Sequence, residues 1–165
     1  MTAHPACRVR RARPTDLEAV LGVIAEGKAV PPSAPEQPPR VTDLERDTWV
    51  RMTRTPDLSV YLADVDGTAV GTAAMLLMPH LTYGCHPTAF IEAVAVKYAH
   101  RRRGIARQLL TQALDDAREA GCLKVQLLSH KRHADDGAHR LYQNAGFTAE
   151  AEGFRLYLKP WRVPN

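Results

Sequence analysis

The sequence has few cysteines and no long apolar run. Its three cysteines, Cys7, Cys85 and Cys122, are widely spaced and form no CxxC pair, so neither a disulfide framework nor a zinc site is expected. The longest weakly polar run covers residues 69–79 and is far shorter than the roughly 20 apolar residues that a membrane-spanning helix needs. We therefore expect no contact with a membrane.

The N-terminus also lacks the pattern of a secretory signal. Residues 1–7 lead directly into the arginine-rich stretch 8–13, and no apolar segment follows these basic residues. A secretory signal needs such an apolar segment after its positive charges. We therefore predict a cytoplasmic location.

A strong excess of one charge is absent as well. The chain has 22 basic and 18 acidic residues, a net charge of +4, which is modest for a protein that binds nucleic acid. Its 165 residues are 45% hydrophobic and 24% charged, as in ordinary folded domains. No internal repeat or linker divides the chain, so residues 1–165 are expected to form one domain with an adequate core.

The periodicity of apolar residues predicts an α/β fold with a mixed, mostly antiparallel sheet and flanking helices. The Asp66-Gly67 pair is a strong hairpin signal, and residues 89–128 are expected to form a central βαβ unit. The predicted strands cover residues 9–13, 59–65, 68–78, 89–96 and 123–128, with a closing pair at 147–150 and 155–158. Helices are predicted from Pro14-Thr15-Asp16, from Asp43 to before Pro56, from Ile105 to the cap at Gly121, and over 135–144. The second of these is expected to bury Leu44, Trp49 or Val50, and Met52.

The stretch 30–40 has a different composition from the rest of the chain. It contains five prolines, which exclude regular secondary structure and favour an extended loop within the domain.

Positive charge is concentrated in residues 97–107. This stretch has five formal positive charges and a histidine but no acidic residue. A helix start already carries about half a positive charge from its unpaired amides, so cations are unfavourable there unless an anion binds. Gly104 and the small Ala106 would leave these amides open to a phosphate. We therefore predict an anion site.

Two common phosphate-binding loops do not match this stretch. It has no Gly-Lys-Ser/Thr end, which a Walker loop requires. The first glycine of the dinucleotide fingerprint is missing, and residues 123–129 offer no acidic partner for a ribose.

The pattern Arg101-x-x-Gly104-x-Ala106 between an apolar strand and an amphipathic helix resembles the acetyl-CoA signature of the GNAT superfamily of N-acetyltransferases. The resemblance extends from about residue 60 to 158 and includes the His139-Arg140-Leu141-Tyr142-x-x-x-Gly146-Phe147 segment. The first 58 residues are hard to match; in this superfamily that part is shaped to the acceptor.

The resemblance implies acetyl-CoA as cosubstrate. Amides of residues 102–106 would bind its pyrophosphate, the arginine side chains would add charge at the phosphates, and the amide of Val94 would polarise the thioester carbonyl. The implied cofactor-binding residues are Val94, Ala95, Val96, Arg101, Arg102, Arg103, Gly104, Ile105 and Ala106.

Tyr142 stands where the superfamily commonly has its general acid. Its phenol would protonate the departing thiolate; the alternative is a core tyrosine whose hydroxyl bonds to the backbone.

Glu92 interrupts an otherwise apolar strand. Strict alternation would place it on one face with Phe90, Val94 and Val96, where burial would raise its pKa toward that of a useful base. The Ile91-Glu92-x-Val94 stretch is similar to glucosamine-phosphate N-acetyltransferases, but Ala93 stands where those enzymes tend to have a second acid. A structural carboxylate is the alternative.

A metal site is not expected. The histidines and aspartates at His130, His133, Asp135, Asp136 and His139 are more simply explained by a polar loop that leads into a capped helix.

These observations together predict an acetyl-CoA-dependent N-acetyltransferase. No cysteine lies beside a plausible base in the motif region, which favours direct attack by a primary amine of a small molecule in a ternary complex. A CoA-binding regulatory protein without turnover and a basic nucleic-acid-binding module are alternatives; the basic run lacks interleaved aromatics, so no nucleic acid is expected. The acceptor and the choice between a monomer and a homodimer stay open.

Overall fold

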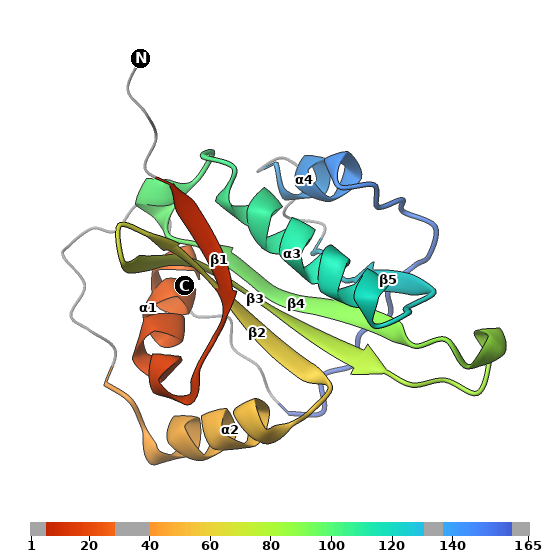
Figure 1. Ribbon diagram of the computed structural model, residues 1–165, viewed down its shortest axis with the longest axis horizontal. Coiled ribbons are helices and arrows are strands. Elements are labelled where there is room, and N and C mark those ends of the chain that lie inside the picture. The colour runs from red at the N-terminus through yellow and green to blue at the C-terminus, as the bar shows by residue number, and fades with distance from the viewer. Residues whose placement is uncertain (1–5, 29–39, 131–136, 160–165) are drawn as a thin grey trace. The chain divides into compact units, whose positions relative to one another are not determined.

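The computed structural model describes residues 6–28, 40–130 and 137–159, and its centre is a five-stranded sheet in the order β1-β2-β3-β4-β5 (Figure 1). The strands are β1 (Cys7–Arg11), β2 (Leu58–Val65), β3 (Thr68–Met78), β4 (Thr88–Val96) and β5 (Lys124–Leu127). The helices are α1 (Leu17–Lys28), α2 (Asp43–Arg54), α3 (Ile105–Glu119) and α4 (Ala138–Asn144). None of the helices in the described ranges is long and apolar enough to cross a membrane.

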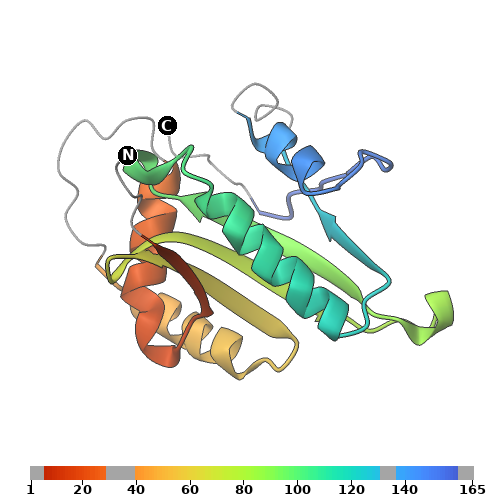
Figure 2. The same cartoon turned by 45° about the horizontal axis from the view of Figure 1, so that its top comes forward.

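Only β4 and β5 pair in parallel, while the other neighbouring strands are antiparallel. The predicted mixed, mostly antiparallel sheet with a central βαβ unit is therefore confirmed. The chain divides into two compact units, Met1–Leu127 and Leu128–Asn165. In the first unit α1 and α2 cover one face of the sheet and α3 covers the other (Figure 2). The loop predicted at 30–40 lies outside the described residues except for Arg40.

The hairpin between β2 and β3 has the predicted turn. Asp66 and Gly67 have φ values of 50° and 77°, the left-handed conformations that a type I′ turn requires at both central positions. This turn matches the twist of the two strands, so the dipeptide fixes their register.

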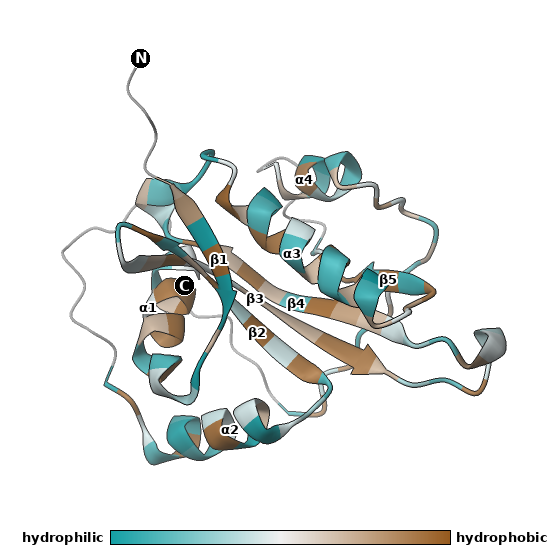
Figure 3. Ribbon diagram, viewed as in Figure 1, coloured by the Kyte–Doolittle hydropathy of each residue, from teal (hydrophilic) through white to brown (hydrophobic). Residues whose placement is uncertain are grey.

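The core of the first unit has a layer on each side of the sheet. Val20 of α1, Trp49 of α2 and Leu62 of β2 form one buried cluster. Apolar residues of α3 form the other, and Figure 3 shows brown segments alternating with teal ones along this helix. Burial of each large side chain contributes about 1.5–3 kcal/mol to folding.

Helix α3 approaches β3 unusually closely at Gly71. A β-carbon added there would lie 2.8 Å from Cγ2 of Ile105 and 3.0 Å from Cδ1 of Leu109. Glycine is therefore required by the space between the two elements rather than by the backbone conformation.

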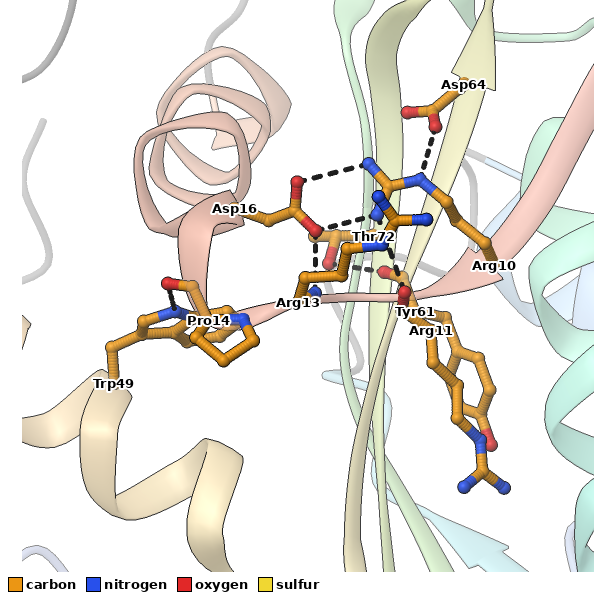
Figure 4. Close-up of polar contacts among 9 residues, drawn as sticks. All are labelled: Arg10, Arg11, Arg13, Pro14, Asp16, Trp49, Tyr61, Asp64 and Thr72. Carbon is orange, nitrogen blue, oxygen red and sulfur yellow. Dashed lines mark hydrogen bonds and ion pairs between the residues drawn. The ribbon is translucent and has the colours of Figure 1, made fainter.

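The inward face of α2 contains the predicted Trp49 and Met52 but not Leu44. Leu44 is 76% exposed, whereas Trp49 is 4% exposed and donates from Nε1 to the carbonyl of Pro14 at 2.8 Å (Figure 4). Trp49 and Met52 share a helical stripe toward the core, and Leu44 lies five positions before Trp49, outside that stripe. The expectation that Leu44 is buried was wrong.

Arg10 and Arg11 of β1 are held by aspartates. Figure 4 shows Arg10 between Asp64 and Asp16, with Nε 2.7 Å from Asp64 Oδ2 and Nη1 2.7 Å from Asp16 Oδ2. The hydrogen bond from Arg10 holds the pKa of Asp16 below its usual value. Arg11 Nη2 lies 2.7 Å from Oδ2 of Asp116 in α3.

Asp116 links β1 and β2 to α3. Besides Arg11, it accepts hydrogen bonds from the Tyr61 hydroxyl at 2.8 Å and from Nε2 of Gln112 at 2.8 Å. Burial alone would raise the pKa of Asp116, but these hydrogen bonds outweigh burial and lower it. Burial, followed by the bond to Asp116, raises the pKa of Tyr61.

The second unit lacks the predicted closing strands. Among its described residues, 145–159 contain no helix or strand, and Phe154, Leu156 and Leu158 are 88%, 82% and 89% exposed. Two isolated strands are marginal in water because they need a further layer to cover their apolar side chains. The expected pair at 147–150 and 155–158 was therefore wrong for this structure.

Candidate active site

Strand β4 contains a bulge that the sequence did not predict. Ala93 and Val94 stand opposite the single residue Ala73 of β3, and Ala93 has a φ of 53°. The parallel pairing with β5 ends just before it, at Ile91 and Leu127. From residue 92 to 96, the edge of β4 that faces β5 therefore has no strand partner in the described part of the chain.

The open edge carries Val94, Ala95 and Val96, three of the predicted cofactor-binding residues. A strand edge without a partner can pair with an extended molecule through its main-chain groups. The described part of the chain thus leaves free the strand edge that the sequence-based prediction assigned to the pantetheine arm of CoA.

The turn between β4 and α3 presents main-chain amides without acceptors. Arg102 and Gly104 have φ values of 62° and 78°. Within the described ranges, no acceptor bonds the amides of residues 102–107, and the first bond at the helix start runs from Gln108 N to Gly104 O at 3.1 Å. Adjacent amides in such alternating conformations form a concave anion site. We call residues 102–107 the amide turn.

The surroundings of the amide turn are open and positively charged. A β-carbon at Gly104 would meet no atom within 4 Å. Arg102, Arg103 and Arg107 are exposed, and none of them forms an ion pair with a residue that the structure describes. Ile105 is only 3% exposed because its side chain packs into the core, so it offers the turn its amide alone.

Arg101 differs from the other arginines of this stretch. Its Nη2 donates to the carbonyl of Gly27 at the end of α1, 2.6 Å away, and its guanidinium lies over the ring of Tyr98. Its own amide donates to the Tyr98 carbonyl at 3.1 Å. The sequence placed Arg101 among the cofactor contacts, but both its amide and its side chain have protein partners.

Glu92 is exposed, so the predicted burial of its carboxylate was wrong. The prediction that Glu92 and Val96 share one face of the sheet was also wrong. Glu92 pairs with Ala74, which pairs with Val60, and Val60 packs on the side of α1 and α2. Val96 instead pairs with Gly71, which faces α3. The bulge shifts the alternation by one residue between them.

Tyr142 lies in α4 of the second unit and is half-buried. Its ring meets that of Phe147 edge-to-face, with 6.1 Å between centroids. The Phe147 amide donates to the Tyr142 carbonyl at 3.0 Å, and Gly146 between them has a φ of 94°. The tyrosine and the Gly-Phe turn therefore form one local motif at the end of α4.

These features are matched by a known family. The model of the acetyltransferase (GNAT) family matches residues 26–147, most of the chain and parts of both units. The chain belongs to the GNAT family.

Individual relatives agree with this assignment. A glucosamine 6-phosphate N-acetyltransferase from Trypanosoma brucei brucei is 26% identical over 144 residues, 87% of this chain and 90% of that protein. A solved structure from Agrobacterium tumefaciens str. C58, named provisionally as an acetyltransferase, is 33% identical with a TM-score of 0.79 and covers 91% of this chain and 99% of that one. A structure from Bacillus halodurans C-125, named a transcriptional regulator, is 27% identical with a TM-score of 0.81 and covers 93% and 100%.

The family assignment confirms the resemblance, and acetyl-CoA is consistent with it as cosubstrate. Three residues of the histidine and aspartate cluster at 130–139, for which a metal site was considered, lie outside the described residues: His133, Asp135 and Asp136.

Sequence reasoning missed Gly27 and Lys97, which attach α1 to the region of the site. A β-carbon at Gly27 would lie 2.9 Å from Cβ of Ala95, and Lys97 Nζ forms an ion pair with Glu26 Oε1 at 2.8 Å. A glycine within a predicted helix was the one available signal, since it often indicates close packing.

Proposed function

We propose that this chain transfers an acetyl group from acetyl-CoA to a primary amine of a small molecule, by direct attack in a ternary complex. The observation that carries this proposal is the amide turn, which follows the open edge of β4 along the chain. The strand edge suits the extended pantetheine arm of CoA, and the amide turn suits its phosphates.

In this proposal the pyrophosphate binds the amides of residues 102–106. Arg102, Arg103 and Arg107 add positive charge at the phosphates, since exposed guanidinium groups form strong charge-assisted hydrogen bonds with phosphate oxygens. The pantetheine arm pairs with Val94 and Val96, and the Val94 amide polarises the thioester carbonyl.

The chemical step breaks the thioester C–S bond and forms a C–N bond. The amine nitrogen must first lose a proton, because an ammonium with a pKa of about 10 is mostly protonated at neutral pH. We assign Glu92 as proton acceptor, directly or through water, because its carboxylate is exposed beside the bulge. Tyr142 protonates the leaving thiolate.

Direct transfer is favoured over an acyl-enzyme. Burial raises the pKa of the Cys7 and Cys122 thiols, which leaves little reactive thiolate at neutral pH. All three cysteines are free, and none lies in the β4–α3 region.

Amino sugars and their phosphates come first among the acceptors to be tested, because the curated relative carries that activity in its name. Ala93 stands beside Glu92 where a second acid is expected in glucosamine-phosphate enzymes, so other amines belong in the same panel. A CoA-binding regulatory protein without turnover is the second candidate, because one close structural neighbour is named a transcriptional regulator.

The test is an amine panel with acetyl-CoA, followed by release of free thiol. The panel contains glucosamine 6-phosphate, glucosamine, an aminoglycoside, a polyamine and amino acids. We expect amine-dependent thiol release and a rise in melting temperature with CoA. A melting shift without turnover on any amine favours the regulatory candidate, whereas no shift at millimolar CoA contradicts both.

The catalytic assignments are tested with Tyr142→Phe and Glu92→Gln in the same assay. Each is expected to lower kcat about 10²-fold while CoA still raises the melting temperature. The Glu92→Gln variant should recover as rising pH deprotonates the free amine. Unchanged kcat removes the substituted residue from the mechanism.

A further inference from the structure

Arg101 opens the phosphate-binding pattern, yet its side chain is directed at the end of α1. Nη2 donates to Gly27 O at 2.6 Å, Nε lies 3.4 Å from Val96 O, and the guanidinium carbon is 5.2 Å from the centroid of the Tyr98 ring. Gly27 O is one of the last four carbonyls of α1, which lack partners within the helix. A cation is favourable at that helix end, so Arg101 caps α1.

An ion pair also holds the same helical turn. Lys97 Nζ lies 2.8 Å from Glu26 Oε1, and these side chains are 20% and 36% exposed. Between the two attachments, Gly27 packs so closely on Ala95 that no β-carbon fits without displacement. We call the Arg101–Gly27 and Lys97–Glu26 contacts the α1 clamp.

The α1 clamp joins the last turn of α1 to both ends of the connection that leads from β4 to the amide turn. Arg101 directly precedes Arg102, the first residue of that turn, and Lys97 directly follows β4. Ala95, beneath Gly27, neighbours Val94, whose amide meets the thioester in the proposed function. These contacts connect the amide turn with the helix end beside the residue that meets the thioester in the proposed function.

We propose that Arg101 is a positioning residue that couples occupancy of the amide turn to the last turn of α1, and so to binding of the amine. This inference rests on the proposed function. Coupling between two ligands is reciprocal, so CoA and the amine strengthen each other's binding by the same factor. The first residue of the signature would thus organise the acceptor side, while Arg102, Arg103 and Arg107 hold phosphate.

Hydrogen–deuterium exchange with CoA as the probe tests the coupling without turnover. In the unchanged protein, CoA should slow exchange in residues 102–107 and in the last turn of α1. In Arg101→Ala, CoA should still protect residues 102–107 but no longer α1. Protection of residues 102–107 without any effect on α1 in the unchanged protein overturns the coupling, and protection of neither segment overturns the proposed function itself.

Steady-state kinetics with two acetyl donors separates positioning from phosphate binding. S-acetylpantetheine lacks the nucleotide and its phosphates, so a phosphate contact cannot affect its use. With S-acetylpantetheine the amide turn stays empty, so the coupling acts only with acetyl-CoA. Arg101→Ala should raise the KM of the amine about tenfold at saturating acetyl-CoA and change it little with S-acetylpantetheine, whereas Arg103→Ala should raise only the KM of acetyl-CoA. If Arg101→Ala raises the KM of acetyl-CoA and leaves the KM of the amine unchanged, Arg101 is a phosphate ligand and the proposal is overturned.

Two further variants guard against a trivial loss of stability. Arg118→Ala removes an exposed arginine that pairs with Asp115 within α3, and it should leave both KM values unchanged. If Arg101→Ala loses its cooperative melt, Arg101→Lys replaces it. Lysine keeps the positive charge for phosphate but not the planar fork that bonds a carbonyl while lying over Tyr98. An unchanged amine KM in Arg101→Lys, with a normal melt, counts against positioning.

Discussion

The chain has two arginine-rich segments, and the structure uses them differently. In β1, Arg10 and Arg11 bind Asp16, Asp64 and Asp116 at 2.7 Å and tie the edge strand to helices on both faces. At the start of α3, Arg102, Arg103 and Arg107 have no ion pair among the described residues. The fold pairs Arg10 and Arg11 of the first segment with carboxylates, whereas the second segment stays positive next to unbonded amides.

Local composition therefore does not separate a structural arginine from one that binds a ligand. The partners of the β1 arginines include residues 64 and 116, far away along the chain, so the pairing depends on the tertiary fold. Position within a helix is more informative. Cations at a helix start conflict with the helix dipole, and such local conflicts are concentrated at functional sites.

The largest expected effect comes from placing a negative charge in the amide turn. Gly104→Asp should lower affinity for CoA at least 10²-fold by repelling phosphate. Gly104→Asn is the matched control, since asparagine has the same shape without the charge and also tolerates a positive φ. Calorimetry with CoA measures both. Equal affinities in the two variants would mean that the anion binds elsewhere.

Removing the partner of the β1 arginines should instead affect the fold. Asp116→Ala leaves the buried Tyr61 hydroxyl without its acceptor and should lower the free energy of unfolding by about 2–3 kcal/mol. The neighbouring Asp115→Ala breaks only an exposed pair within α3 and should cost less than about 0.5 kcal/mol. Urea unfolding gives both values, and similar losses would deny Asp116 its linking role.

Ionic strength should affect the two arginine-rich segments differently, with a smaller effect than the substitutions above. Raising ionic strength from low salt to about 0.5 M shortens the Debye length to a few ångströms, so the KM of acetyl-CoA should rise about fivefold. The melting temperature should change little over this range, because the aspartates of the β1 pairs are 10–18% exposed. A KM that is insensitive to salt would contradict a phosphate role for the exposed arginines.

The smallest effect is expected from acid. The pKa values of Asp16 and Asp116 are lowered in the folded state, so their contribution to stability is complete above their usual pKa near 3.8 and is lost as pH falls through the lower folded values. The melting temperature should therefore drop by a few degrees below about pH 4. Asp116→Ala should show a shallower drop, which a pH series of thermal melts can measure.

The sequence predicted the elements that have local signals. Asp66-Gly67 located the hairpin, and Gly121, with a φ of 71°, ends α3 as a C-terminal cap should. The position of the amide turn could also be predicted, because Arg101 to Ala106 break the usual charge rule of a helix start; that it binds an anion stays a prediction.

Features that depend on tertiary packing could not be predicted from the sequence. The bulge at Ala93 is not encoded by a glycine, so strict alternation gave Glu92 the wrong burial and grouped it with Val96. The partner of Arg101 is Gly27, at the end of a helix 74 positions earlier. Such contacts depend on how elements pack, which no local pattern records.

Gly71 has a consequence for the size of the cosubstrate. It allows the first turn of α3, which follows Gly104, to pack closely against β3. The arm of CoA has a fixed number of bonds between thioester and pyrophosphate, so the protein has to match that span. The absence of a methyl group at residue 71 therefore keeps α3 close to β3. Gly71→Ala would push the two elements apart and lengthen the span that each acyl donor has to fit.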